Sequence, residues 1–219
     1  MNKILKWVGI LTISALLIQF TPQVLHAQTA KSILDRASAK LKNAKTIKAD
    51  IKLTMKNRNG EVDRNGTQSG TFSMKGDAYR IDFDNTQIIT DGETIWTYLV
   101  PNKEVQIANY VASEQAISPS VLFSGAYDKD FTYTGRTTRK INNKEVHIIK
   151  LTPKGRQSFA SVDIYIDKSF DIVGGILNLK NGSTVEYSIP QIQYNPTVSD
   201  ASFKFDTQNN TGVEVIDLR

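Results

Sequence analysis

The chemistry open to this chain is limited by two residue types. It contains no cysteine, and His26 and His147 are its two histidines. Without cysteine there is no thiol nucleophile, thiolate metal site or disulfide. His26 lies in an N-terminal segment with the features of a leader, and His147 alone cannot supply the several histidines typical of catalytic zinc. This composition favours a protein that holds a ligand over one that transforms it.

Paired carboxylates are the remaining candidates for catalysis. Asp82 and Asp84 share one face of a predicted strand, as do Asp163 and Asp167, so two glycosidase-type pairs can be drawn. Each pair alternates with apolar residues, which predicts that all four carboxylates face solvent. We interpret His147, between two apolar residues, as structural. No catalytic residue, metal ligand or cofactor is therefore predicted, and a secreted hydrolase using Asp82 or Asp163 is the weakest functional alternative.

The N-terminus has the three parts of a secretory signal peptide. Lys3 and Lys6 precede an apolar stretch over residues 7–20, and Leu25-His26-Ala27 ends in a small residue suited to cleavage. The apolar stretch is shorter than the ~20 residues of a membrane-spanning helix. We therefore expect residues 1–27 to be removed and residues 28–219 to form one domain in the periplasm. Loss of the two lysines lowers the net charge from +5 to +3, which gives no reason to expect nucleic acid.

Hydrophobic periodicity predicts a helix followed by a sheet. Apolar residues recur at helical spacing from Ala30 to Leu41, with Thr29 placed as the N-cap. From Ile47 onwards apolar and polar residues alternate, which predicts antiparallel strands with one solvated face. Turn-forming pairs separate the strands, at Asn59-Gly60, Asn65-Gly66, Asp91-Gly92 and Asn181-Gly182. About eleven strands are expected, near residues 47–57, 67–75, 78–84, 87–91, 94–99, 104–108, 130–135, 144–152, 159–167, 171–179 and 184–193.

A meander of this length curls toward a barrel because its twist accumulates. The strand pattern is interrupted once, where Ser118-Pro119 predicts a helix start and Val121, Leu122 and Phe123 form one apolar turn. Two helices are too few to fill the concave side of such a sheet. Either the concave side keeps apolar room or the core beneath the helices is fully packed, and the pattern alone does not separate these alternatives.

Three segments of the sequence resemble the LolA family of periplasmic outer-membrane lipoprotein carriers. They are Gln87–Tyr98, Leu151–Lys154, and a tail that runs from Asp200–Phe205 to Gly212–Asp217, and their order and spacing also match. The resemblance implies a mainly β fold with a helical lid (α+β), an incomplete, strongly curved antiparallel β-barrel of eleven strands. It also implies a monomeric chaperone that receives lipoproteins from an ABC-type exporter in the inner membrane of a Gram-negative cell and delivers them to an outer-membrane acceptor.

Such a carrier needs apolar surface to replace the membrane around acyl chains. If the family fold applies, a cavity and a lid hold the chains, and their predicted lining is Leu53, Met55, Tyr79, Ile81, Phe83, Val121, Leu122 and Phe123. One departure concerns the Arg-Pro pair whose arginine fastens the lid in well-known members. Gly76-Asp77 stands in the corresponding place, and the alternation directs the nearby Arg80 away from the face of Tyr79. A related half-barrel that senses lipid or lipoprotein and regulates a signalling partner is the alternative function.

Processing of the leader is directly testable. Because the charged, apolar and small-residue parts lie in the order that signal peptidase requires, we expect the mature protein to begin at Gln28. N-terminal sequencing of protein from the periplasmic fraction measures this. Periplasmic protein that still carries residues 1–27 would contradict the prediction.

Overall fold

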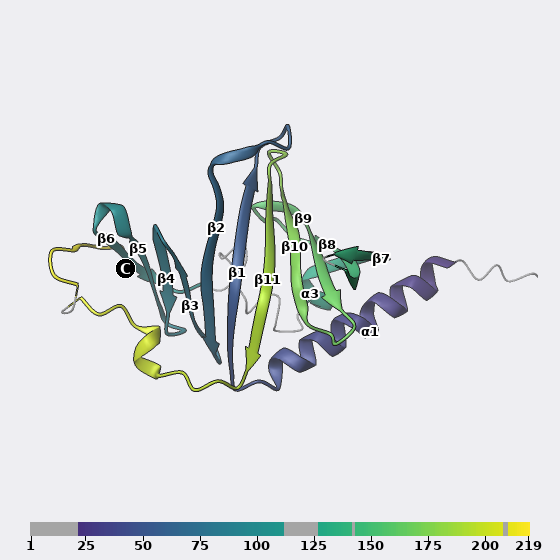
Figure 1. Ribbon diagram of the computed structural model, residues 1–219, viewed down its shortest axis with the longest axis horizontal. Coiled ribbons are helices and arrows are strands. Elements are labelled where there is room, and N and C mark those ends of the chain that lie inside the picture. Colours follow the sequence, from purple (N-terminus) through teal and green to yellow (C-terminus); the bar gives the residue numbers. More distant parts are fainter. Residues whose placement is uncertain (1–21, 112–126, 142, 208–209) are drawn as a thin grey trace, which may run out of the picture.

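The fold is one long curved sheet with a helix across part of its concave side (Figure 1). The computed structural model describes residues 22–111, 127–141, 143–207 and 210–219. Among these residues, helix α1 (Pro22–Lys42) comes first, and three short helical turns follow among the strands: η1 (Val100–Asn102), α3 (Tyr127–Asp130) and η3 (Asp200–Phe203). The strands are β1 (Thr46–Lys56), β2 (Val62–Lys75), β3 (Ala78–Phe83), β4 (Thr86–Thr90), β5 (Thr94–Leu99), β6 (Glu104–Asn109), β7 (Phe131–Ile141), β8 (Lys144–Pro153), β9 (Phe159–Asp167), β10 (Ile172–Leu179), β11 (Thr184–Tyr194) and β12 (Glu214–Asp217).

The order of strands in the sheet confirms the predicted meander and adds one strand to it. The order is β12-β6-β5-β4-β3-β2-β1-β11-β10-β9-β8-β7. Strands β1 to β11 correspond to the eleven expected segments, and all the pairings among these eleven are antiparallel. The twelfth strand, β12, was not expected and pairs parallel with β6. None of the described helices is long and apolar enough to cross a bilayer.

Two local predictions are wrong. Thr29 does not cap the helix, because α1 already begins at Pro22, a residue suited to the first helical position. Asn65-Gly66 is not a hairpin turn, because β2 continues through it from Val62 to Lys75. Gly66 has φ +60°, and the pairing of β1 with β2 shifts register between Thr54 and Lys56, so a bulge absorbs the dipeptide. The predicted lid turn of Val121, Leu122 and Phe123 lies outside the described residues.

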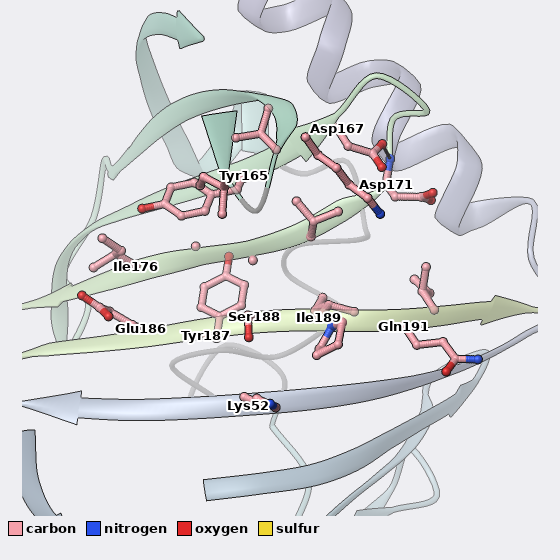
Figure 2. Close-up of a pocket in the computed structure, with 18 of the residues that line it drawn as sticks. Lys52, Tyr165, Asp167, Asp171, Ile176, Glu186, Tyr187, Ser188, Ile189 and Gln191 are labelled. Carbon is pink, nitrogen blue, oxygen red and sulfur yellow. Dashed lines mark hydrogen bonds between the residues drawn. The ribbon is translucent and has the colours of Figure 1, made fainter. Parts of the chain in front are cut away.

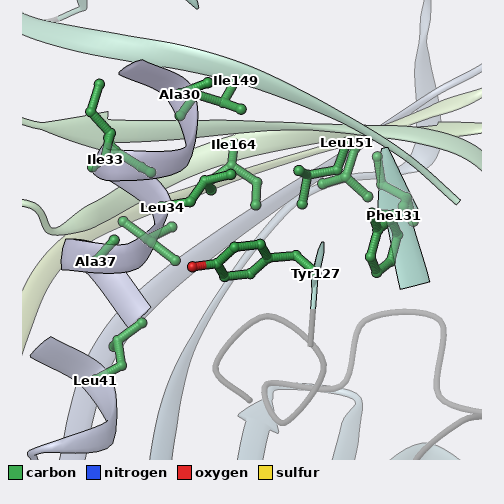
Figure 3. Packing of buried hydrophobic residues seen from close by; sticks show 14 of the residues in the cluster. Ala30, Ile33, Leu34, Ala37, Leu41, Tyr127, Phe131, Ile149, Leu151 and Ile164 are labelled. Atoms are coloured by element: carbon green, nitrogen blue, oxygen red, sulfur yellow. The ribbon is translucent and has the colours of Figure 1, made fainter. Parts of the chain in front are cut away.

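Helix α1 buries one apolar stripe on the concave side, called the inner face below. The stripe consists of Ala30, Ile33, Leu34, Ala37 and Leu41, and it packs in one cluster with strand residues that include Ile149, Leu151 and Ile164 (Figure 3). Tyr127 of α3 extends from the sheet toward the helix, and its hydroxyl donates a hydrogen bond of 2.7 Å to Asp35. The apolar residues at helical spacing thus form one buried stripe of the helix, as the sequence predicted.

Polar contacts fasten the C-terminal half of α1 to the β9–β10 hairpin. Lys40 Nζ lies 2.6 Å from Asp171 Oδ1, and it donates a bond of 3.1 Å to the carbonyl of Ser169. The Tyr194 hydroxyl donates to the same Asp171 carboxylate. Arg36 Cζ lies 5.0 Å from the ring centre of Phe170, and Lys40 Nζ lies 5.0 Å from that of Tyr194, both in cation–π geometry.

The C-terminal segment covers the opposite, outer face of the sheet, at the other end from α1 (Figure 1). Ile89 and Val105 form a second apolar cluster there with Phe205, whose ring centre lies 5.1 Å from that of Tyr98. Phe203 in η3 is also buried. The backbone N–H of Glu214 then donates to Lys103 O at 2.8 Å, where β12 begins beside β6.

The polar contacts of α1 predict that two nearby lysines contribute differently to the free energy of unfolding. Lys40→Met removes the ion pair and the bond to Ser169, so the free energy of unfolding should fall by about 1–2 kcal/mol. Lys42→Met is the control, because Lys42 is exposed in the same last turn, and its effect should stay within about 0.5 kcal/mol. Urea unfolding followed by circular dichroism measures both variants. Equal effects would show that the contacts of Lys40 do not stabilise the docked helix.

Candidate functional site

The inner face of β1, β2 and β3 brings the predicted cavity residues together. β2 lies between the other two strands, and Gly70 of β2 pairs with Ile51 on one side and Phe83 on the other. Phe72 pairs in the same way with Ala49 and Ile81, and Met74 pairs with Ile47 and Tyr79. Leu53 and Met55 continue the same face along β1. The period-two alternation therefore assigned all five described candidates to one face.

The five residues differ in how far they are buried. Tyr79 is only 3% exposed and packs edge-to-face on Tyr110, with ring centres 5.9 Å apart. Burial raises the pKa of the Tyr79 phenol, and the neighbouring Tyr110 adds to the rise. Leu53, Ile81 and Phe83 are half-buried. Met55 is 38% exposed, so the face runs from closed packing at Tyr79 to open surface at Met55.

Phe83 lies flat on the sheet because Gly70 has no side chain. A Cβ atom at Gly70 would lie 2.6 Å from Phe83 Cδ1 and would also overlap the backbone carbonyl of Asp82. Because Gly70 has no side chain, the ring packs directly on the backbone of β2. Aromatic residues often pack in this way opposite a glycine in a neighbouring strand. Phe83, which is half-buried, then presents apolar ring surface on the inner face.

Sequence reasoning missed several residues of the same face. Met74 and Ile88 are half-buried there, and Phe72 and Tyr110 contribute to the same region. Phe72 and Met74 follow the alternation of a predicted strand and could have been found from it. Ile88 could not, because its neighbour Ile89 is equally apolar and faces the other side, where it belongs to the second cluster. Tyr110 follows the end of β6 and lies in no periodic pattern.

The carboxylates suggested for catalysis have structural partners. Asp167 accepts hydrogen bonds from the backbone N–H groups of Ser169 at 2.8 Å and Asp171 at 3.0 Å, which closes the β9–β10 turn. Asp163 accepts a bond of 3.1 Å from Asn178, and Asp84 is exposed. Within the described residues, no three histidine or carboxylate side chains lie close enough to share a metal ion. His147 pairs across the strands with Ile166, a residue of the inner cluster.

Arg80 lies on the outer face, as its alternation predicted. Its Nε donates to the Asp82 carboxylate at 2.8 Å, and its Nη2 donates to Gln87 at 3.1 Å. Its Nη1 donates to the carbonyl of Ser202 in η3 at 3.4 Å. Arg80 therefore ties the C-terminal segment to β3 and makes no contact with α1 through these bonds.

A groove of about 820 Å³ on the outer face was not predicted (Figure 2). Its lining includes Lys52, Glu186, Asp167 and Asp171, together with apolar Ile176. Lys56 reaches Glu186 at 2.7 Å nearby. Charges of both signs would have to be desolvated against a hydrocarbon chain, so this groove is less suited to acyl chains than the inner face.

A curved open sheet with an apolar inner face and a helix across it defines a half-barrel binding fold. The chain belongs to the LolA family, since the family described as outer membrane lipoprotein carrier protein LolA matches residues 42–206. This is a family of non-catalytic binding proteins. The outer-membrane lipoprotein carrier protein of Pasteurella multocida is 28% identical over 215 residues, which cover 96% of this chain and 97% of that one. That of Hahella chejuensis is 26% identical over 190 residues, covering 84% and 87%.

The fold has a counterpart among solved structures. The crystal structure of an uncharacterized conserved protein from Thermus thermophilus matches with a TM-score of 0.56 at 13% identity. The match covers 87% of this chain and 99% of that one. At this identity the likeness concerns the fold alone.

The packing of the Phe83 ring on Gly70 predicts that Gly70 is required for stability. Gly70→Ala would place Cβ against the Phe83 ring and the Asp82 carbonyl, so the free energy of unfolding should fall by about 1–3 kcal/mol. Gly155→Ala is the control, because a Cβ there meets nothing within 4 Å. Denaturant unfolding of both variants tests this. Removing the ring as well, in Gly70→Ala/Phe83→Ala, should restore little of the lost stability, because the clash with the backbone carbonyl of Asp82 remains.

Proposed function

We propose that this protein carries lipoproteins through the periplasm by holding their acyl chains on the inner face. The observation that carries the proposal is the set of half-buried apolar side chains on one face of β1 to β4: Leu53, Met74, Ile81, Phe83 and Ile88. Membership of the LolA family supports the same assignment. The relatives' names supply the cargo class, lipoproteins bound for the outer membrane.

The energetics of the cargo explain why such a face is needed. Each buried CH₂ contributes about 0.8 kcal/mol, so a lipoprotein with three chains of roughly sixteen carbons would lose on the order of 30 kcal/mol on entering water unprotected. A carrier has to replace most of that environment while still releasing its cargo. Contact with apolar side chains does this, because apolar burial is non-directional and scales with area. No bond is made or broken, so the task requires no nucleophile and no metal.

The direction of transport requires two membrane partners. We propose that an ABC-type exporter in the inner membrane supplies the lipoprotein and that an acceptor at the outer membrane removes it. Both assignments follow from the family, and each needs the inner face to be presented to the partner. Export directed by the leader would bring the protein to that compartment, and processing to Gln28 would release it there.

Phe83 allows the proposal to be tested in a graded way. Phe83→Ala removes part of the apolar contact, so capture should weaken about three- to tenfold without being abolished. Leu218→Ala is the matched control, because it removes apolar surface that is 64% exposed beyond β12. The measurement is release of a radiolabelled lipoprotein from inner-membrane spheroplasts of the native host by equal amounts of each folded protein.

Three outcomes separate the alternatives. Full release by the wild type and Leu218→Ala with reduced release by Phe83→Ala is the expected result. Unchanged release by Phe83→Ala would place the acyl chains elsewhere. No release by the wild type, with its native exporter present, would refute transport and favour a half-barrel that senses lipid or lipoprotein for a signalling partner.

A further inference from the structure

The Tyr187 hydroxyl is a buried polar group without a hydrogen-bond partner in the described part of the chain. A buried hydroxyl without a partner is rare in folded proteins, because its lost hydration is not replaced. Tyr187 also borders the outer groove (Figure 2), whose lining includes Gly174 and Gly175, but solvent in that groove does not reach its buried hydroxyl. The position of this group therefore needs an explanation.

Tyr187 belongs to the inner face. It stands opposite Leu53 of β1 and opposite Gly175 of β10, and the next residue on its side of β11, Val185, is part of the inner cluster. A Cβ at Gly175 would lie 2.6 Å from Tyr187 Cζ, so the ring lies over the glycine as Phe83 lies over Gly70. The hydroxyl is thus held on the face that the proposed function assigns to acyl chains.

We infer that the Tyr187 hydroxyl donates a hydrogen bond to the carbonyl oxygen of an ester-linked or amide-linked acyl chain. The inference rests on the proposed function and adds a polar contact to an otherwise apolar site. A ligand carbonyl supplies an acceptor that the described part of the free protein does not, and it reaches the buried hydroxyl when the acyl chains displace the side chains that cover it. Burial also raises the pKa of this phenol, so it remains protonated and able to donate at any physiological pH.

The position of the polar carbonyl in an acyl chain identifies the class of ligand. In a diacylglyceryl group the carbonyl is the polar atom at which each hydrocarbon chain begins, and everything beyond it is apolar. With its carbonyl at Tyr187, a chain can extend across Leu53 and Ile51, which lead over β1 to Gly70 and Phe83. The single donor would therefore fix the depth to which one chain, the one whose carbonyl it binds, enters.

The experiment compares two lipids that differ only in the carbonyl. Dipalmitoylglycerol carries two ester carbonyls, whereas dihexadecylglycerol carries ether linkages and the same hydrocarbon. Binding of each to the purified protein is measured by displacement of a fluorescent fatty-acid probe. The wild type should bind the diester about three- to tenfold more tightly than the diether. Tyr187→Phe should bind both with the affinity that the wild type has for the diether.

A stability measurement separates loss of a ligand contact from loss of structure. Because none of the described residues hydrogen-bonds to this hydroxyl, Tyr187→Phe should melt at or above the wild-type temperature. Tyr98→Phe is the matched control on the outer face, beside Phe205, and it should keep the preference for the diester.

Each result bears on a different claim. A wild type that binds the two lipids equally, or a Tyr187→Phe variant that keeps the diester preference, would overturn the inference while leaving apolar capture intact. A Tyr187→Phe variant that melts well below the wild type would show that the hydroxyl has a structural partner, which also overturns it. Failure of the wild type to bind either lipid would refute the proposed function itself.

Discussion

The structure depends on one constraint: the alternating strands of a twelve-stranded sheet have apolar sides that must be removed from water. The two ends of the chain meet this need at opposite places. Helix α1 covers the inner face at the β7 end with its stripe from Ala30 to Leu41, while Phe203 and Phe205 cover the outer face at the β4–β6 end. Between them, on the inner face of β1 to β4, Leu53, Ile81 and Phe83 remain half-buried and give the sheet its capacity to bind apolar ligands.

The attachment of α1 combines an apolar centre with a polar rim. Phe170 has φ +62° in the β9–β10 turn, a conformation that costs a side-chain-bearing residue about 1–2 kcal/mol and that glycine would adopt freely. The ring compensates through its contact with Arg36, and Asp171 in the same turn binds Lys40. Such partly exposed rim contacts contribute about 1–2 kcal/mol, less than burial of several apolar side chains does. The helix is therefore held firmly by its apolar stripe, with the rim fixing its position over the hairpin.

The sequence predicted the strands well because their alternation is nearly uninterrupted and their turns use dipeptides with positive φ. It could not predict β12, because Glu214 to Asp217 alternate as weakly as many loops and their partner β6 is distant in the chain. Asn65-Gly66 shows a related limit, since the same dipeptide serves a hairpin or a bulge depending on the neighbouring strand. For the candidate site, the alternation predicted on which face of the sheet each residue lies but not how deeply its side chain is buried. Tyr79 is closed off by Tyr110, a residue outside any periodic pattern, and no local signal reveals that Tyr187 lacks a partner.

The position of Arg80 bears on how the inner face is kept covered. In the family resemblance an arginine fastens the lid, and Arg80 was the nearest replacement for it. Its bonds to Asp82 and to Ser202 instead hold the C-terminal segment on the outer face, so they cannot restrain a cover on the inner one. The polar contacts that hold α1 include the Tyr127–Asp35 hydrogen bond and the Lys40–Asp171 ion pair. Both join the helix to elements of the β7–β10 end, which leaves the half-buried surface of β1 to β4 free of that restraint. In this chain the polar contacts of the helix therefore lie away from the surface proposed for cargo, whereas its apolar stripe shares one cluster with residues of that surface such as Leu53 and Ile81.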